Sequence, residues 1–278
     1  MHRIKANGAD MPCLGMGTWT LEGRQCADLV AHAIDVGYRH IDTAASYGNE
    51  EAVGAGIRAS GIARGEIFVT TKVWHTDLRA ADFRRSAEDS LRRLGLDQVD
   101  LLLIHWPSRT VPLAETIGAL NRAREDGLTR NIGASNFPVA LLAEALELSA
   151  APIAANQVEY HPRLDQRKVL EACRAAGAAM VSYCPLFRGG ALFGEPAIAA
   201  AAQNHDKTPA QIVLRWHIQQ DGVAAIPRSS SKERIAENID IFDFTLTEPE
   251  MAAISALRTA NSRICDFAFS PQWDQPAD

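Results

Sequence analysis

Cysteine is scarce in this sequence, and the placement of its five residues excludes two common classes of site. The cysteines are odd in number and scattered over 278 residues, and no two of them stand in C-x-x-C spacing. This argues against a disulfide framework and a structural zinc site, and it fits a reducing compartment. No two of the eight histidines have a metal-ligand spacing such as H-x-x-x-H, so we expect no metal.

Basic runs and long apolar runs are missing as well. The chain has 28 basic and 34 acidic residues, a formal charge of −6, which argues against nucleic acid as a partner. Its apolar runs are far shorter than the ~20 residues that a membrane span needs, and residues 1–15 contain no apolar signal segment. We expect a cytoplasmic protein that binds neither nucleic acid nor membrane.

The sequence does contain a repeated alternation of two kinds of segment. Eight short β-type runs alternate with amphipathic, helix-like segments. Some runs, such as residues 101–104, are continuously apolar, as parallel strands buried on both faces are. Eight strand–helix units predict an α/β fold, a (β/α)8 TIM barrel, with residues 1–278 as a single domain. The runs are residues 13–17, 40–44, 67–73, 99–105, 130–135, 153–160, 178–184 and 223–228.

The sequence also predicts the structure of the segments outside the eight strand–helix units. Residues 1–12 are expected to form an N-terminal β-hairpin with a type I′ turn at Asn7-Gly8. Two extra helices are expected, one within the long seventh unit at residues 185–222 and one at residues 247–260. Residues 261–278 form a C-terminal tail that we expect over the barrel mouth. Five helix-like segments end in glycine, as helix C-caps often do: Gly37, Gly61, Gly95, Gly127 and Gly177.

Polar side chains collect where the β-type runs end, which is where the active sites of such barrels lie. Asp42 stands near the end of the second run, and Tyr47 follows it in a small polar loop. Lys72 and His105 stand at the ends of the third and fourth runs. Because neighbouring strands are only ~4.8 Å apart, these four groups can share one site.

The four residue types suit general acid catalysis. A phenol titrates near ~10, which is too high for a good acid at neutral pH, and a lysine ammonium beside it lowers that pKa. Asp42 can keep Lys72 charged and oriented, so that Tyr47 becomes a tuned proton donor. His105 can hydrogen-bond a substrate carbonyl oxygen. Taken alone, Asp42 and Lys72 also fit a structural ion pair, and His105 fits a satisfied rim histidine.

Three tryptophans stand near the same strand ends. Trp19, Trp74 and Trp106 are expected to form an apolar wall that excludes water, and the alternative is that they are core residues. Trp216 lies in the helical stretch "IVLRWHI" and is expected in the core.

One glycine-rich stretch is discounted as a phosphate loop. Residues 54–59, "GAGIRA", match G-x-G-x-x-A. A dinucleotide-binding loop must follow a strand and open a helix, whereas this stretch lies inside the helix expected from about Asn49.

The motifs at these positions resemble those of the aldo-keto reductases. The resemblance runs from Leu14 to the tail, and within the family the chain is most similar to small bacterial members of the 2,5-diketo-D-gluconate reductase or methylglyoxal reductase type. The matching stretches are "GMGTW", "IDTAASYGNE", "VTTKVW", "VDLLLIHWP", "IGASNF", "NQVEYHP", "SYCPL" and "IPRSSSKERIAEN".

This resemblance implies a catalytic tetrad and an NADPH cofactor, with NADH as a weaker alternative. In the tetrad, Tyr47 would donate the proton, Lys72 and Asp42 would tune it, and His105 would orient the substrate. The implied contacts around the nicotinamide are Ser135, Asn136, Gln157 and Tyr183. Those around the adenosine and its 2′-phosphate are Arg228, Ser229, Ser230, Arg234, Glu237 and Asn238. The other implied cofactor contacts are Thr18, Trp19, Asp42, Cys184 and Leu186. The implied substrate contacts are Trp19, Trp74, His105 and Trp106.

Two residues depart from the usual family pattern. Arg228 stands where lysine is common, and since arginine binds phosphate bidentately, a preference for NADPH is still expected while its margin over NADH stays open. Cys184 stands where serine is common, and a thiol is a poorer donor toward the pyrophosphate region. Nearby, Ser230 and Glu233 are interpreted as a capping box at a helix start.

The function predicted from the sequence is an NADPH-dependent carbonyl reductase that acts on small aldehydes, α-dicarbonyls or diketo sugar acids. The connection "PSRTVP" is short, which predicts a broad pocket, and Phe267, Phe269 and Trp273 in the tail are candidates to line it. Two alternatives stay open: a cofactor-binding sensor or regulatory barrel without turnover, and an isomerase or aldolase inferred from the fold alone. The family default is a monomer.

Overall fold

Eight parallel strands form the barrel that the sequence predicts, in a computed structural model that describes residues 2–277. The strands are hydrogen-bonded in sequence order, and a bridge between Leu14 and Ala225 joins the last to the first. The Gly15 amide donates to the Ala225 carbonyl, and the Ala225 amide donates to the Cys13 carbonyl, each at 2.9 Å. The strands are β3 (Met16–Gly17), β4 (His40–Asp42), β5 (Phe68–Val73), β6 (Val99–Ile104), β7 (Thr129–Ser135), β8 (Ile153–Glu159), β9 (Ala179–Tyr183) and β10 (Val223–Ala225).

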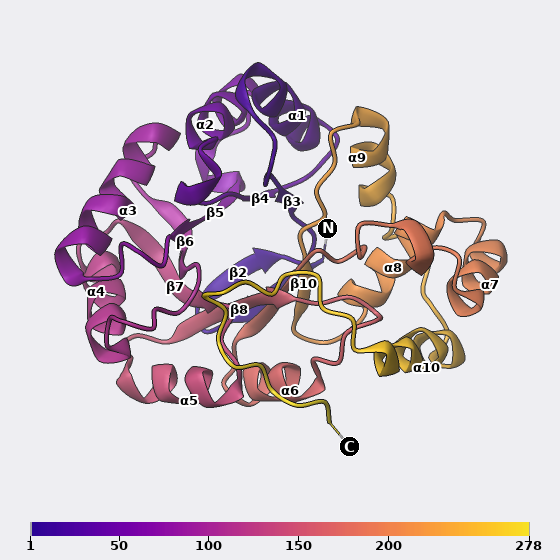
Figure 1. Cartoon of the computed structure of the whole chain (residues 1–278). Coiled ribbons are helices and arrows are strands. Elements are labelled where there is room, and N and C mark those ends of the chain that lie inside the picture. Colours follow the sequence, from indigo (N-terminus) through magenta and orange to yellow (C-terminus); the bar gives the residue numbers. More distant parts are fainter. Residues whose placement is uncertain (1, 278) are drawn as a thin grey trace.

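Helices surround the sheet in a ring (Figure 1). Eight of them follow the eight strands, and the two predicted extra helices are α7 (Pro196–His205) and α10 (Glu248–Ala256). The predicted fold class is therefore confirmed. The ring consists of α1 (Gly23–Asp35), α2 (Glu50–Ala59), α3 (Ala80–Leu94), α4 (Leu113–Glu125), α5 (Val139–Leu148), α6 (Arg167–Ala175), α8 (Pro209–Ile218) and α9 (Lys232–Ile239).

The N-terminal hairpin pairs β1 (Arg3–Ala6) with β2 (Ala9–Pro12), as predicted. Asn7 and Gly8 have φ angles of 45° and 91°, which a type I′ turn requires. The Asn7 amide nitrogen donates to the carbonyls of Ile153 and Ala176 at 2.8 and 2.9 Å. Since Ile153 begins β8, the hairpin lies at the end of the barrel opposite to the carboxyl ends of the strands.

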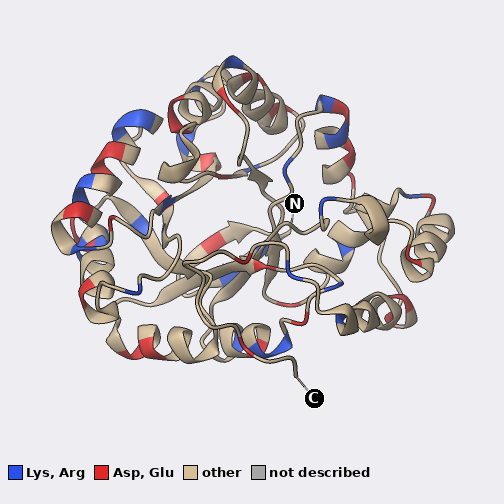
Figure 2. Cartoon of the chain, in the orientation of Figure 1, with Lys and Arg blue, Asp and Glu red and all other residues tan. Residues whose placement is uncertain are grey.

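The five glycines predicted to end helices all have positive φ. Gly95 shows the reason: at φ 67° its amide donates to the Arg92 carbonyl, and this left-handed conformation ends α3. Every residue of β5 is buried, and the burial of Leu101–Ile104 in β6 explains the apolar run there. Charged residues lie mainly on the outer faces of the helices (Figure 2). No helix among residues 2–277 has the length and apolarity to cross a membrane.

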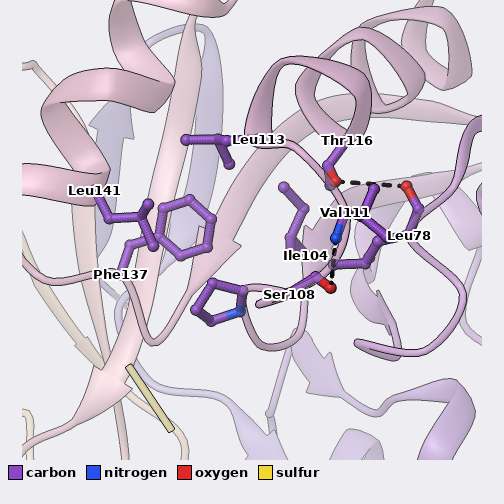
Figure 3. Close-up of a pocket in the computed structure, with 9 residues that line it drawn as sticks. Leu78, Ile104, Ser108, Val111, Leu113, Thr116, Phe137 and Leu141 are labelled. Carbon is purple, nitrogen blue, oxygen red and sulfur yellow. Dashed lines mark hydrogen bonds between the residues drawn. The ribbon is translucent and has the colours of Figure 1, made fainter. Parts of the chain in front are cut away.

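A small apolar cavity lies between β6 and the helices α4 and α5 (Figure 3). Its volume is about 30 Å³, and Ile104, Thr116 and Phe137 are among its lining residues. The Thr116 hydroxyl, which lines the cavity, donates to the Leu78 carbonyl at 3.4 Å. A space of this size holds about one water molecule, and it is not a substrate site.

The discounted glycine-rich stretch lies inside α2, as predicted. A Cβ atom on Gly54 would lie 2.1 Å from the Leu94 carbonyl oxygen, and one on Gly56 would lie 2.6 Å from the Ala27 carbonyl oxygen. These glycines therefore allow α2 to pack closely against α3 and α1.

Gly54→Ala should lower the free energy of unfolding by about 1–3 kcal/mol or more, because the added methyl group meets backbone. Gly118→Ala is the matched control, since Gly118 lies inside α4 with no atom near its Cβ position. That change should stabilise the protein by about 0.5–1 kcal/mol. Urea unfolding measures both. Unchanged stability together with weakened dinucleotide binding in Gly54→Ala would restore the phosphate-loop interpretation.

Candidate active site

Four residues expected to share a site meet at the carboxyl ends of β4, β5 and β6. Asp42 is the last residue of β4, and Tyr47 ends η1 (Ala45–Tyr47), the short helix that follows. Lys72 lies in β5, beside β4, and His105 follows β6. Because the three strands are consecutive in the barrel, their ends bring these side chains together.

Lys72 is the centre of the cluster. Its side chain is fully buried, and its ammonium nitrogen donates to Asp42 Oδ1 at 2.6 Å, the Thr43 carbonyl at 2.8 Å and the Tyr47 hydroxyl oxygen at 3.3 Å. An ammonium has three donors, so all are used. Burial alone would lower the pKa of Lys72, but the charge of Asp42 and the Tyr47 phenol outweigh it and raise that pKa.

The predicted direction of the Tyr47 pKa is wrong for the resting protein. Burial raises the pKa of Tyr47, and the nearby Asp42 charge adds to the increase. Lys72 lowers it, as predicted, but does not overcome burial. The phenol therefore keeps its proton throughout the neutral range.

His105 is a neutral imidazole in contact with the phenol. Burial, followed by the charges of Lys72 and His75, holds the pKa of His105 well below its usual value. The His105 and Tyr47 ring centres are 5.5 Å apart. The Ser46 hydroxyl lies 3.3 Å from His105 Nδ1, and if it donates there, the ring proton lies on Nε2. The sequence does not indicate Ser46 as a site residue, because its contact with His105 is visible only in the folded structure.

The residues implied to surround the nicotinamide form one hydrogen-bonded chain. The Gln157 amide donates to Asp42 Oδ2 at 2.7 Å, and the Ser135 hydroxyl donates to the Gln157 carbonyl at 2.8 Å. The Asn136 amide donates to Ser135 Oγ at 3.0 Å, and the Tyr183 hydroxyl donates to Asn136 Oδ1 at 2.7 Å. This chain connects β9 to the tetrad acid across the barrel.

Aromatic side chains form a wall on one side of the site. Trp74 lies 4.9 Å from His105 between ring centres, and Trp106 is buried. Phe269, from the tail, packs edge-on against both tryptophans at 5.5 and 5.3 Å. Trp19 differs, since this residue is 49% exposed. Trp216 is buried in the core, as predicted.

The C-terminal tail crosses the strand ends (Figure 1) and is fixed by a buried carboxylate. Glu159, the last residue of β8, accepts hydrogen bonds from the Ile264 amide at 2.6 Å and the Cys265 amide at 2.7 Å. His161 Nε2 lies 3.0 Å from the same carboxylate. Burial opposes ionisation of Glu159, but the bonds from His161 and the two amides prevail and lower its pKa.

The tail also contacts β9 through a pair of thiols. Cys184 comes just after β9 and Cys265 lies in the tail, and interaction with Cys265 lowers the pKa of the Cys184 thiol. Cys184 has a left-handed φ of 50°, and Leu186, two residues later, packs against the core.

The residues implied to hold the adenosine end lie on β10, α9 and the segment between them. Arg228 and Arg234 are exposed, and within residues 2–277 neither forms an ion pair. Arg228 donates to the Trp19 carbonyl at 3.2 Å. Ser229 and Asn238 are buried, whereas Ser230 is exposed. The Glu237 carboxylate accepts a hydrogen bond from the Thr208 hydroxyl at 2.7 Å. Thr18 is buried, and its hydroxyl donates to the Asp42 carbonyl at 2.9 Å.

The predicted capping box at Ser230 and Glu233 is wrong. The N-cap of α9 is Ser231, whose hydroxyl oxygen accepts the Arg234 amide at 3.2 Å and whose hydroxyl donates to Glu233 at 2.6 Å. The helix begins one residue later than the box requires, so Glu233 binds the cap side chain and not the cap amide. Over the described part of the chain, no cluster of metal-ligating side chains occurs.

Comparisons with known proteins agree on one family. The profile of the aldo/keto reductase family matches residues 13–259. A glyoxal reductase of Bacillus subtilis (strain 168) is 44% identical over 252 residues, which cover 90% of each chain. A crystal structure provisionally named 2,5-diketo-D-gluconic acid reductase B has a TM-score of 0.96, 45% identity and coverage of 99% of this chain and 98% of that one. A Bombyx mori aldo-keto reductase in complex with NADP has a TM-score of 0.89, 35% identity and coverage of 96% and 95%.

Glu159→Gln should release the tail near Ile264 and Cys265, because it removes the charge that both amides bind. The free energy of unfolding should fall by about 1.5–3 kcal/mol, as for hydrogen bonds to a charged group. Hydrogen exchange of these two amides should become faster. Since the pKa of Glu159 is lowered, its contribution is fully present above the usual value of 4.5 and is lost only as the pH falls through the lowered pKa.

Asp165→Asn is the control for this prediction, because Asp165 holds the tail elsewhere by accepting the Ala277 amide at 3.1 Å. It should leave exchange at residues 264 and 265 unchanged. Equal protection of those amides in the wild type and Glu159→Gln would show that the carboxylate does not fix the tail.

Proposed function

The chain belongs to the aldo/keto reductase family, and from this premise we propose that it reduces small carbonyl compounds with NADPH, with Tyr47 as the proton donor. The observation that carries the proposal is the Lys72 ammonium, which joins Asp42 to the Tyr47 hydroxyl in one buried cluster. A merely structural ion pair would not need a phenol as its third neighbour, or a neutral imidazole beside that phenol.

The protein's own part in the reaction is proton transfer. When bound, a reduced nicotinamide would supply the hydride for the carbonyl carbon. The Tyr47 hydroxyl gives its proton to the carbonyl oxygen, and the Lys72 ammonium at 3.3 Å stabilises the phenolate that remains. His105 is neutral, and with the Ser46 hydroxyl 3.3 Å from its Nδ1 it can donate from Nε2 to the same oxygen and orient it.

The residues around the tetrad fit a nicotinamide carboxamide. Gln157 Oε1 accepts no hydrogen bond from residues 2–277, so it can accept one from the carboxamide nitrogen. The Tyr183 ring is fixed through its hydroxyl on Asn136 and can stack on the nicotinamide. At the other end, Arg228 and Arg234 are exposed cations that have no acidic partner among residues 2–277, which suits a 2′-phosphate.

The aromatic side chains of the site and the names of similar proteins both support the proposed substrate class. Trp74, Trp106 and Phe269 make an apolar side to the site, which can exclude water from a small carbonyl substrate. Relatives carry the names glyoxal reductase and 2,5-diketo-D-gluconic acid reductase B. We therefore propose small aldehydes, α-dicarbonyls and diketo sugar acids as substrates. Asp42, Tyr47, Lys72 and His105 all lie in one chain, so the proposed reaction needs no residue from a second subunit.

Tyr47→Phe should reduce kcat for methylglyoxal by at least about 10²–10⁴-fold, the usual contribution of a general acid. NADPH affinity, measured by fluorescence titration, should change little, because the phenol hydroxyl is not proposed to hold the cofactor. A variant that turns over at nearly the wild-type rate would refute the role of Tyr47. Tight NADPH binding by the wild type with no turnover across a carbonyl panel would favour the sensor alternative.

Arg228→Gln and Arg234→Gln should each raise the dissociation constant for NADPH by about 10–100-fold, since each removes a charged hydrogen-bond donor. The affinity for NADH should change much less, because NADH has no 2′-phosphate. Arg85→Gln is a control, since Arg85 is an exposed arginine on α3, remote from the mouth. Equal losses of affinity for NADPH and NADH would show that these arginines do not recognise the 2′-phosphate.

A further inference from the structure

Asn49 stands at the N-cap of α2, a position that asparagine commonly occupies because its side chain can accept a bond from the first helix amides. In the described part of the chain, however, the Asn49 side chain makes no such capping bond. The residue is buried, and its amide group binds the loops at the mouth of the barrel instead. Helix capping therefore does not explain the asparagine at this position.

The Asn49 side chain connects two loops that carry residues of the candidate active site. Its Nδ2 donates to the Thr18 carbonyl at 2.8 Å and to the Leu21 carbonyl at 2.9 Å, in the loop that contains Trp19. Its Oδ1 accepts the Thr43 hydroxyl at 2.8 Å. The two N–H donors face carbonyl oxygens and the amide oxygen faces a hydroxyl, so the bonds fix the orientation of the amide.

Thr43 links Asn49 to the tetrad. It is fully buried, and its amide donates to the Thr70 carbonyl of β5 at 2.9 Å. Its carbonyl accepts a bond from the Lys72 ammonium at 2.8 Å, while its hydroxyl binds Asn49. The chain continues from Thr43 through η1 to Tyr47. A rotation of Thr43 would therefore move an acceptor of the ammonium and the segment that carries the phenol.

The Lys72 ammonium is sensitive to such a movement because each of its three N–H donors has an acceptor. If the Thr43 carbonyl turned away, the ammonium would reorient toward its remaining acceptors. Its contact with the Tyr47 hydroxyl oxygen, at 3.3 Å, is the longest of the three and is the one that the proposed proton transfer needs. A misplacement of about 1 Å in a reacting group can cost about 100-fold in rate.

We propose that Asn49 is a positioning residue for proton transfer, which acts through the Thr43 hydroxyl to keep the Lys72 ammonium on the Tyr47 phenol. This inference rests on the proposed function and adds to its site a residue that lies outside the tetrad. Asn49 acts through its neighbours, since its hydrogen bonds go to the two loops and not to the reacting groups.

The start of α2 has an anchor of its own, so changes at Asn49 can be tested in a folded protein. Glu50, the first residue of the helix, is buried. Its carboxylate accepts the Thr71 hydroxyl at 2.5 Å and two N–H groups of Arg93 at 2.8 and 2.6 Å. These bonds hold the helix to β5 and α3 without any contribution from Asn49.

The test compares Thr43→Val, which removes the hydroxyl but keeps a branched side chain, with Thr43→Ser, which keeps the hydroxyl. Thr43→Val and Asn49→Ala should each lower kcat for methylglyoxal by about 10–100-fold, while the dissociation constant for NADPH changes little. Thr43→Ser should retain most of kcat. The double variant should be no slower than the slower single variant, because both changes break the same chain of bonds.

Two further measurements distinguish positioning from a merely structural role. The solvent deuterium isotope effect on kcat should increase in Thr43→Val and Asn49→Ala, because proton transfer from Tyr47 then limits the rate more strongly. Expressing kcat per NADPH site, counted by fluorescence titration, removes the contribution of unfolded molecules. A wild-type kcat per site in Thr43→Val, with only a loss of stability, would overturn the inference.

Thr116→Val and Asn121→Ala are matched controls, since both residues are buried and form hydrogen bonds outside the site. The Thr116 hydroxyl donates to the Leu78 carbonyl at 3.4 Å, and the Asn121 amide donates to the Ile117 carbonyl at 2.9 Å within α4. Both variants should lower the free energy of unfolding and keep the wild-type kcat per NADPH site.

The remaining outcomes are distinct from one another. If Asn49→Ala does not fold, the comparison of Thr43→Val with Thr43→Ser decides, and equal kcat values for these two would overturn the inference. Additive losses in the double variant, or weaker NADPH binding with an unchanged kcat, would also overturn it. A low kcat in Tyr47→Phe with wild-type rates in Thr43→Val and Asn49→Ala would refute this inference alone. Absence of turnover by the wild type across the carbonyl panel would refute the proposed function, and this inference with it.

Discussion

A fully buried ammonium is stable only where acceptors surround it, and this requirement organises the mouth of the barrel. Lys72 takes its acceptors from the side chain that ends β4, the carbonyl that follows it and the phenol of η1. These groups coincide only because β4 and β5 are neighbours in register. Gln157, from β8, binds the second oxygen of Asp42 and so connects the cluster across the barrel. The strand pairing that closes the sheet therefore also brings the residues of the site together.

Much of this arrangement could be predicted from the sequence because it depends on local patterns and on one rule of topology. The apolar runs located all eight strands, and the glycines located helix ends such as Gly95. Parallel strands in a barrel end at the same rim, so Asp42, Lys72 and His105 could be placed together without any knowledge of side-chain contacts. The same reasoning rejected residues 54–59, because a position inside a helix cannot cradle a phosphate.

The parts that could not be predicted depend on burial and on contacts between distant segments. Glu159 lies in a recognisable motif, but the amides that it binds come 105 and 106 residues later. No local pattern indicates that pairing. The N-cap of α9 was misplaced by one residue because three consecutive serines, Ser229 to Ser231, offer equal capping chemistry. Only the backbone geometry distinguishes them.

The raised pKa of Tyr47 changes how its pairing with Lys72 is understood. A phenol with a low resting pKa would be partly ionised at neutral pH and would have no proton to give. Burial keeps the proton on Tyr47, while Lys72 stays 3.3 Å from the oxygen. The Lys72 ammonium would attract the Tyr47 phenolate more strongly than the neutral phenol, and the phenolate would form only as the proton leaves. In the proposed reaction, Lys72 would therefore stabilise the transition state more than the resting site, which is the kind of interaction that raises kcat.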